Sequence, residues 1–225
     1  MMKLVRKSRD LAVRGKKARQ YDAFSRRYRM QDLKEYAALA ARHVEDGGSV
    51  LDIATGPGYF CIELARMGRF RVTGLDISED LVEIARANAR QAGVDVDFVQ
   101  GTASVLGFPD ETFDLAFCSW AMKNFMDPAQ VLSETFRVLK PGGSALIVDL
   151  SHEATRQQWN QYAASRRLQG MTALAMGMAF RIQRSGAYSR TQLEALIERS
   201  PFRIHDIQNW GINVCVRLFK NRDAR

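Results

Sequence analysis

Short apolar runs alternate along the chain with longer amphipathic stretches, in the order strand, helix, strand that builds a sheet between two layers of helices. Most of the apolar runs are rich in Val, Ile, Leu and Phe, as strands buried on both faces of a sheet usually are. The pattern predicts seven strands, over residues 49–53, 71–75, 96–99, 113–118, 144–150, 202–209 and 212–219. No internal repeat interrupts this order, so the sequence predicts a single α/β domain.

The two ends of the chain complete this plan. Before the first strand, apolar residues at helical spacing predict helices over residues 18–29 and 31–45, which would cover the ligand edge of the sheet. The last two strands are separated by Trp210 and Gly211, a turn that would pair them as a hairpin.

Residues 151–189, between the fifth strand and the hairpin, are more than a plain connection needs. Residues 152–169 predict a polar amphipathic helix, and an apolar, methionine-rich stretch follows at Met171, Leu174, Met176, Met178 and Phe180. Methionine adapts to irregular apolar surfaces, so this stretch fits a lid over an apolar acceptor such as an aromatic, polyketide-like or prenylated compound. It fits an ordinary core or dimer contact equally well.

The strongest chemical signal follows the first strand. There an apolar run ends near Asp52, and the turn at residues 54–58 carries Gly56 and Gly58, which let the backbone approach a ligand closely. A second acid, Asp76, ends the next strand, where a carboxylate can accept both hydroxyls of a ribose. The pattern predicts a nucleoside-containing ligand. Both acids have an alternative interpretation, in which they only cap helices and bind loop amides.

Two phosphate-binding loops fit this segment poorly. A dinucleotide loop requires a small residue where this chain has Cys61, and a mononucleotide P-loop requires a lysine that does not follow here. Asp52 would repel a pyrophosphate, whereas it suits the ammonium and sulfonium groups of S-adenosylmethionine (SAM).

The sequence resembles class I SAM-dependent methyltransferases in four ordered segments, residues 50–60, 99–103, 106–114 and 136–143. The resemblance covers about residues 20–150 and implies a Rossmann-like, mostly parallel seven-stranded sheet with one antiparallel strand near the C-terminus. It implies SAM as the methyl donor and S-adenosylhomocysteine as the product. Residues 122–127 and 149–151 look most like the quinone-pathway C-methyltransferases. Two positions depart from the family, Ala54 at a common glycine and Thr102 at a common acid beside the adenine.

The resemblance assigns a role to each part of the chain. Residues 1–45 would form a basic arm and helical cap, residues 46–150 the SAM-binding core, residues 151–189 the lid and residues 190–225 the last helix and hairpin. The positions that would bind the cofactor are Asp52, Ala54, Gly56, Gly58, Asp76, Ile77, Gly101, Thr102, Ala103, Cys118 and Ser119. The acceptor would contact Trp120, Lys123, Asn124, Met171, Met176 and Phe180.

Methyl transfer from a sulfonium depends mainly on positioning, and a base is needed only if the acceptor arrives protonated. His152, just past the fifth strand, is the first candidate for that base, although a surface histidine would look the same. Tyr188 and Tyr21 could bind an acceptor hydroxyl or shield the sulfonium, or could simply pack. The three cysteines and three histidines lack metal-ligand spacing, so no metal site is expected, and Cys118 fits a buried strand thiol better than a nucleophile.

Positive charge is concentrated at the N-terminus. Residues 1–30 hold 11 Lys and Arg against two Asp, whereas the whole chain of 225 residues nets +8. Such an arm could bind an anionic membrane surface, RNA or an acidic substrate, or it could be a solvated helix. An odd number of cysteines, a charged N-terminus and the lack of a long apolar run favour a cytoplasmic protein.

Three functions follow, in order of preference. The first is a SAM-dependent methyltransferase acting on oxygen, nitrogen or carbon of a small apolar or aromatic acceptor. The second is an RNA or protein methyltransferase that uses the basic arm, and the third is a SAM-binding scaffold without catalysis.

Overall fold

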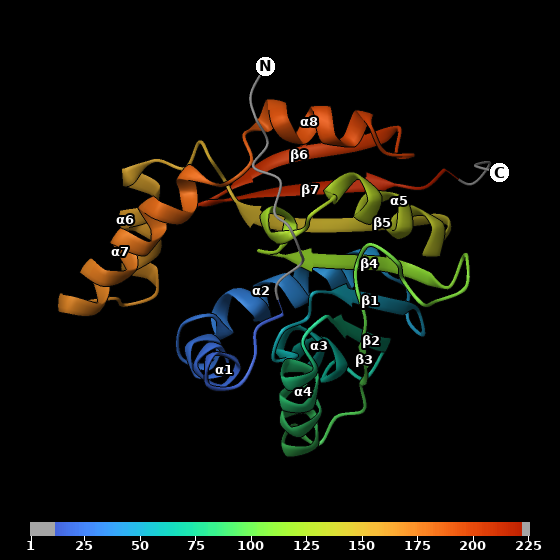
Figure 1. Ribbon diagram of the computed structural model, residues 1–225, viewed down its shortest axis with the longest axis horizontal. Helices are drawn as coiled ribbons and strands as arrows, with labels where there is room; N and C mark the ends of the chain where they lie inside the picture. Colours follow the sequence, from blue (N-terminus) through green and yellow to red (C-terminus); the bar gives the residue numbers. More distant parts are fainter. Residues whose placement is uncertain (1–11, 222–225) are drawn as a thin grey trace.

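A computed structural model describes residues 12–221. Its seven strands form one sheet in the order β3-β2-β1-β4-β5-β7-β6 (Figure 1). The strands are β1 (Ser49–Ile53), β2 (Arg71–Asp76), β3 (Asp97–Gln100), β4 (Phe113–Ser119), β5 (Leu139–Leu150), β6 (Ile204–Trp210) and β7 (Asn213–Phe219). Neighbouring strands from β3 to β5 pair in parallel, while β7 is antiparallel to both β5 and β6. The predicted Rossmann-like sheet with one reversed strand is therefore confirmed.

Helices cover both faces of this sheet (Figure 1). The α-helices are α1 (Lys16–Tyr28), α2 (Met30–Ala40), α3 (Tyr59–Ala65), α4 (Glu79–Ala92), α5 (Pro128–Val138), α6 (Arg156–Ser165), α7 (Gly170–Ser185) and α8 (Arg190–Glu198), and the short 3-10 helices are η1 (Ala41–His43) and η2 (Met122–Asn124). Apolar residues of α5 and α8 pack on one face of the sheet, and those of α2, α3 and α4 pack on the other.

Alternation along the strands explains why two cores form. In β4, Leu115 and Phe117 point to the face covered by α2 and α3, whereas Ala116 and Cys118 point to the face covered by α5. On the first of these faces Phe117 stacks on Phe60, with 3.8 Å between the ring centroids. All these side chains are almost completely buried, so both faces of the central strands exclude water.

The fifth strand is longer than predicted. It begins at Leu139 rather than at residue 144, because Leu139 already pairs with Phe113 before an irregularity shifts the register. Gly142 in this irregularity has a positive φ of 82°, which explains why the sequence pattern indicated a turn there.

Helix boundaries differ from the prediction at two places. The second N-terminal helix ends at Ala40 and tightens into η1, instead of continuing to residue 45. The helix predicted over residues 152–169 spans only Arg156–Ser165, because Thr155 and Gln158 form a capping box that sets its start. Arg167 and Gly170 then take positive φ angles, and α7 begins.

The helical pair α6 and α7 extends beyond the sheet at the carboxyl ends of its parallel strands (Figure 1). The pair carries the methionine-rich stretch, since α7 runs through Gly170–Ser185. Across residues 12–221, every helix is too short or too polar to cross a membrane.

Candidate functional site

A cavity of about 480 Å³ opens at the carboxyl ends of β1, β2, β3 and β4. Parallel strands place their carboxyl ends at one edge of a sheet, where ligands of this class of fold bind. Twelve of the predicted site residues line the cavity, namely Tyr21, Ala54, Gly56, Asp76, Ile77, Gly101, Thr102, Ala103, Ser119, Trp120, Lys123 and Asn124. It is also lined by Val13, Phe24, Arg29, Leu75, Leu81, Ala121, Phe125 and Gln183.

Asp76 connects the glycine loop to the end of β2. Its Oδ2 accepts a hydrogen bond from the Gly56 amide at 2.8 Å, and its Oδ1 accepts one from the Ser78 amide at 2.9 Å. Each carboxylate oxygen has a second lone pair, so Asp76 can still accept hydrogen bonds from a ligand in the cavity. Both interpretations of this acid, loop support and ligand contact, are compatible with the geometry.

Burial raises the pKa of the Asp76 carboxyl, and the amides of Ser78 and Gly56 oppose that rise. Paired donors such as ribose hydroxyls would stabilise the ionised form further, because they replace the water that burial removed.

The two loop glycines have different roles. Gly56 faces the cavity with a φ of 57°, and a Cβ there would lie 3.1 Å from the ring of Tyr21. Gly58, with a φ of 80°, does not line the cavity, and a Cβ there would lie 2.7 Å from Phe98 and 2.8 Å from Ala85. Gly56 thus allows close approach at the site, while Gly58 allows α3 to pack against α4 and β3.

Asp52 lies beneath the loop and is not part of the cavity lining. Its side chain is buried, and the Cys61 thiol donates to its Oδ2 at 3.5 Å. Burial raises the pKa of Asp52 to about 7. The structure therefore supports its loop interpretation and gives no direct contact for the predicted ammonium or sulfonium.

Near the carboxyl ends of β2 and β3 the cavity is lined mostly by apolar side chains. Leu75, Ile77, Leu81 and Ala103 contribute aliphatic side chains there, and Thr102 contributes the hydroxyl found at the position of the family's acid. The Thr102 Oγ1 accepts a hydrogen bond from the Ser104 amide at 3.3 Å. An apolar lining of this kind suits a purine base.

At the opposite end, Trp120 follows β4 with a positive φ of 55° and meets the Arg29 guanidinium, whose Cζ lies 4.2 Å from the indole centroid. Tyr21, Phe24 and Phe125 continue this aromatic wall. The arrangement provides a cation and several ring faces beside one another, as an aromatic or anionic ligand requires.

Arg29 is buried, with an exposed fraction of 5%, although it lines the cavity. Its Nε and Nη2 have no hydrogen-bond acceptor in the part of the chain that the structure describes. The nearest carboxylate, Asp32, lies 3.7 Å from Nε and already accepts hydrogen bonds from Tyr162 and Arg166. Burying a cation whose N–H groups lack acceptors costs free energy, so an anionic group of a ligand that accepts from Nε and Nη2 would stabilise this side chain.

Comparison with known proteins agrees with this geometry. Residues 51–147 match the family model described as "Methyltransferase domain". The chain is 34% identical over 127 residues to the ubiquinone/menaquinone biosynthesis C-methyltransferase of Marinomonas sp., covering 53% of this chain and 51% of that protein. It is 36% identical over 125 residues to the demethylmenaquinone methyltransferase of Listeria welshimeri, covering 53% of each. The chain thus spans about half the length of the curated relatives it matches.

A solved SAM-dependent methyltransferase of Aquifex aeolicus has the same fold, with a TM-score of 0.64, 19% identity and coverage of 90% of this chain and 95% of that one. Residues 51–147 therefore form a methyltransferase domain, and the fold around them is that of SAM-dependent methyltransferases. The predicted family and its cofactor class, SAM, are thereby confirmed.

The residues of the methyltransferase domain fit SAM. Asp76 offers lone pairs for ribose hydroxyls, the apolar lining near Ala103 suits the adenine, and the open donors of Arg29 suit a carboxylate such as that of the methionine part. Across residues 12–221, histidine, cysteine and carboxylate side chains form no group that could hold a metal ion.

Among the described residues of α6 and α7, which lie in the segment predicted as a lid, one residue of α7 reaches this cavity. Gln183 lines the cavity, and its Oε1 accepts a hydrogen bond from the Lys123 ammonium at 3.0 Å. The predicted acceptor residues Met171, Met176 and Phe180 do not line it: Met171 is 79% exposed, and Phe180 packs on Trp159 with 4.8 Å between the ring centroids.

Two predicted bases also lie away from the cavity lining. His152 is exposed, with its Nδ1 3.2 Å from the Arg184 carbonyl oxygen. Tyr188 packs against the core, and burial raises its pKa. Cys118, predicted near the cofactor, lies within that core, and burial raises the pKa of its thiol well above the usual value. Of the three candidate catalytic residues, only Tyr21 is among the described residues that line the cavity.

Four of the eleven Lys and Arg of the basic arm fall on residues 1–11, which lie outside the described residues. The other seven begin at Arg14, and most of them lie in α1. The described end of the arm approaches the cofactor site, since Val13 lines the cavity and the Gly15 amide donates to Asp80 at 3.1 Å. Sequence reasoning missed eight residues of the lining. Four of them adjoin the predicted motifs, namely Leu75, Leu81, Ala121 and Phe125, whereas Val13, Phe24, Arg29 and Gln183 come from segments that no local motif marks.

Proposed function

We propose that this chain transfers the methyl group of SAM to a small aromatic acceptor bearing a hydroxyl group. The observation that carries the proposal is a single cavity that joins the Asp76 and Ala103 end to the aromatic wall around Trp120. A nucleoside and an aromatic ring could then bind side by side, as an in-line displacement requires.

Each part of the cavity would have a separate task. Bound SAM supplies an electrophilic methyl group on a sulfonium. Asp76 would orient the ribose, and Arg29 would hold the carboxylate of the methionine part. Tyr21 and Trp120 would exclude water and present ring faces, since displacement between cofactor and acceptor benefits from a dry site.

Lys123 would meet the acceptor. Its ammonium lies at the mouth of the cavity, where Gln183 fixes it at 3.0 Å. A cation at this place would favour the ionised form of an acceptor hydroxyl and so raise the electron density of its ring. The names of the relatives, both quinone-pathway methyltransferases, support an aromatic ring of the quinol type.

The first test is thermal unfolding of the purified chain with SAM, S-adenosylhomocysteine, NADH and ATP separately. Only the two adenosyl-sulfur ligands are expected to raise the midpoint, because a ligand at 100 times its dissociation constant adds about 2.7 kcal/mol. Asp76→Asn should abolish the rise, whereas Asp97→Asn, an exposed carboxyl on the adjacent β3, should leave it intact.

The second test is turnover. The chain, SAM and a panel of naphthoquinols and substituted phenols are incubated, and methylated product is measured by mass spectrometry. Cofactor binding without turnover of any member would contradict the proposed acceptor and favour a non-catalytic SAM-binding scaffold. Methylation of RNA or protein alone would favour the alternative that uses the basic arm.

A further inference from the structure

The outer face of α7 carries an apolar stripe that faces solvent. Met171, Leu174, Met178 and Ile182 follow one another at intervals of three or four residues, which places them on one side of the helix. Their exposed fractions are 79%, 60%, 59% and 72%. Scattered apolar residues on a surface are ordinary, but a continuous stripe along about three helical turns marks an interaction site.

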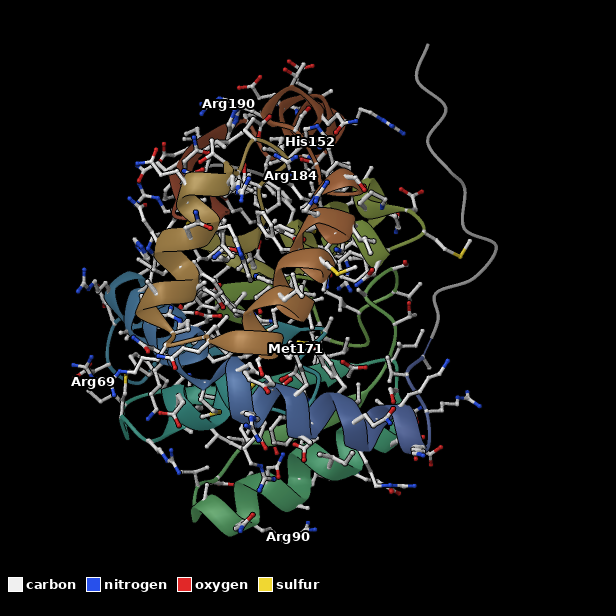
Figure 2. All side chains as sticks on the ribbon, turned by 90° about the vertical axis from the view of Figure 1, so that its left-hand side faces the viewer. Arg69, Arg90, His152, Met171, Arg184 and Arg190 are labelled. Carbon is white, nitrogen blue, oxygen red and sulfur yellow. The ribbon has the colours of Figure 1, made fainter. Side chains whose placement is uncertain are left out.

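The inner face of α7 is already occupied. Phe180 stacks on Trp159 of α6, and Gly177 allows the helices to approach, since a Cβ there would lie 3.3 Å from the Trp159 Nε1. α6 is held in turn by α2, through hydrogen bonds from Tyr162 and Arg166 to Asp32. The outer stripe therefore lies on a helix whose other side packs against α6; Figure 2 shows Met171, the first residue of the stripe, near the start of α7.

Charge around the stripe has one sign. Residues 154–193 contain six arginines and no aspartate or glutamate. Arg167 and Arg181 are exposed, and Arg181 lies next to Ile182 in α7. Apolar side chains flanked by arginine are the pattern of a helix that lies in the interface of a lipid bilayer.

We propose that the outer face of α7 docks on an anionic lipid bilayer. Met171, Leu174, Met178 and Ile182 would enter the acyl boundary, while arginines such as Arg181 would meet the lipid headgroups. The arginines beside the stripe are complementary in charge to anionic headgroups, which favours a lipid bilayer over the other candidate partners. A second copy of the chain would oppose one arginine-rich face to another, and RNA would leave an aliphatic stripe uncovered.

Docking there would place the cavity next to the membrane. Gln183, one residue beyond Ile182, lines the cavity mouth and accepts the hydrogen bond from Lys123. A lipophilic acceptor could thus pass from the bilayer to the cavity without crossing water. This consequence rests on the proposed function, whereas the docking itself does not depend on the identity of the acceptor.

The experiment is co-sedimentation of the full chain with vesicles, using equal parts phosphatidylglycerol and phosphatidylcholine in one set and phosphatidylcholine alone in the other. Binding is expected to be stronger to the anionic set. Ile182→Glu should weaken it by about tenfold, since it removes one apolar anchor and adds a repelled charge. Ile182→Trp should strengthen it, and this gain should require vesicles, since misfolded and aggregated protein would also sediment without them.

Ile204→Glu is the matched control. Ile204 is 51% exposed, and its pairing with Phe219 puts it at the end of the hairpin opposite the turn, away from α7. Equal vesicle binding by Ile182→Glu and Ile204→Glu would overturn the proposal, and so would equal binding to both vesicle sets. A dimer that dissociates in Ile182→Glu, with vesicle binding unchanged, would identify the stripe as a contact between copies instead. SAM-dependent thermal shifts of the same variants test the proposed function independently.

Discussion

At the scale of single residues, Asp52 and Asp76 end neighbouring strands and yet serve different purposes. Asp76 holds two loop amides and faces the cavity, while Asp52 lies below the loop with the Cys61 thiol as a partner. Burial raises the pKa of both carboxyls, and that of Asp52 reaches about 7. The sequence places both acids at the site, but only the packing of the loop decides which one meets a ligand.

The raised pKa of Asp52 predicts a pH-dependent stability. Unfolded Asp52 would lose its proton near pH 4, whereas the folded form keeps it until about pH 7. The folded state therefore binds more protons between these values, and the free energy of unfolding falls as pH rises through this window. An asparagine side chain does not titrate, so the free energy of unfolding of Asp52→Asn should not fall in this window. Its difference from the parent should therefore grow by up to about 4 kcal/mol from pH 4 to pH 7. Urea unfolding of the cofactor-free chain at several pH values measures it, and a constant difference would contradict the assignment.

Arg29 provides a second test at this scale. Arg29→Gln should weaken SAM binding by about 10- to 100-fold, because it removes a charge-assisted contact to the carboxylate. Decarboxylated SAM should bind the parent and the variant equally, as measured by calorimetry. Arg27→Gln is the control that should change neither ligand, because Arg27 is an exposed arginine of α1, two residues before Arg29. Equal losses for both ligands would assign Arg29 to another role.

At the scale of elements, the loop between β1 and α3 depends on helix packing as much as on the ligand. Gly58 is the N-terminal cap of α3 in left-handed conformation, and its Cα approaches Phe98 of β3 and Ala85 of α4. Gly58 therefore allows the start of α3 to pack closely against β3 and α4, and this packing in turn places Gly56 at the cavity.

Gly58→Ala should lower the free energy of unfolding by about 3 kcal/mol, because the added methyl is strained in φ and also overlaps two side chains. Gly47→Ala is the matched control, since Gly47 has a φ of 81° and nothing within 4 Å of a Cβ. It should cost only about 1 kcal/mol. Chemical denaturation of the three proteins compares the values, and equal losses would mean that backbone strain alone requires Gly58.

At the scale of the whole molecule, α6 is joined to the N-terminal helix α2. Asp32 of α2 is 1% exposed and accepts hydrogen bonds from Tyr162 of α6 and from Arg166 at its C-terminal cap, more than 100 residues away in sequence. The same carboxylate is the nearest counter-charge to Arg29, which lines the cavity. One buried acid thus connects α2, α6 and a residue of the cavity lining.

Asp32→Asn should destabilise the fold by about 3 kcal/mol, because it leaves the buried Arg29 without its nearest carboxylate and removes the more buried of the two carboxylates that pair with Arg166. Glu35→Gln is the control on the same helix, since Glu35 also pairs with Arg166 but its side chain is 42% exposed. Its loss should stay below about 1 kcal/mol. Thermal unfolding of both variants compares the two losses of stability. Similar losses would show that the hydrogen bonds from Tyr162 and Arg166 to Asp32 do not hold α6 in place.

Local periodicity and short motifs at strand ends were enough to predict the seven strands along the chain, the terminal hairpin, the glycine loop and most residues around Asp76 and Trp120. The resemblance to the family supplied the one reversed strand, and the sequence did not specify the order of the strands in the sheet. It did not determine that Arg29 and Gln183 line the cavity, that Asp52 lies below the loop, or that His152 and the stripe of α7 face solvent. Those features depend on contacts between segments far apart in the chain, such as Arg29 with Trp120 and Asp32 with Arg166. Local patterns specify which face of an element is apolar, but only tertiary packing decides which of those faces is covered.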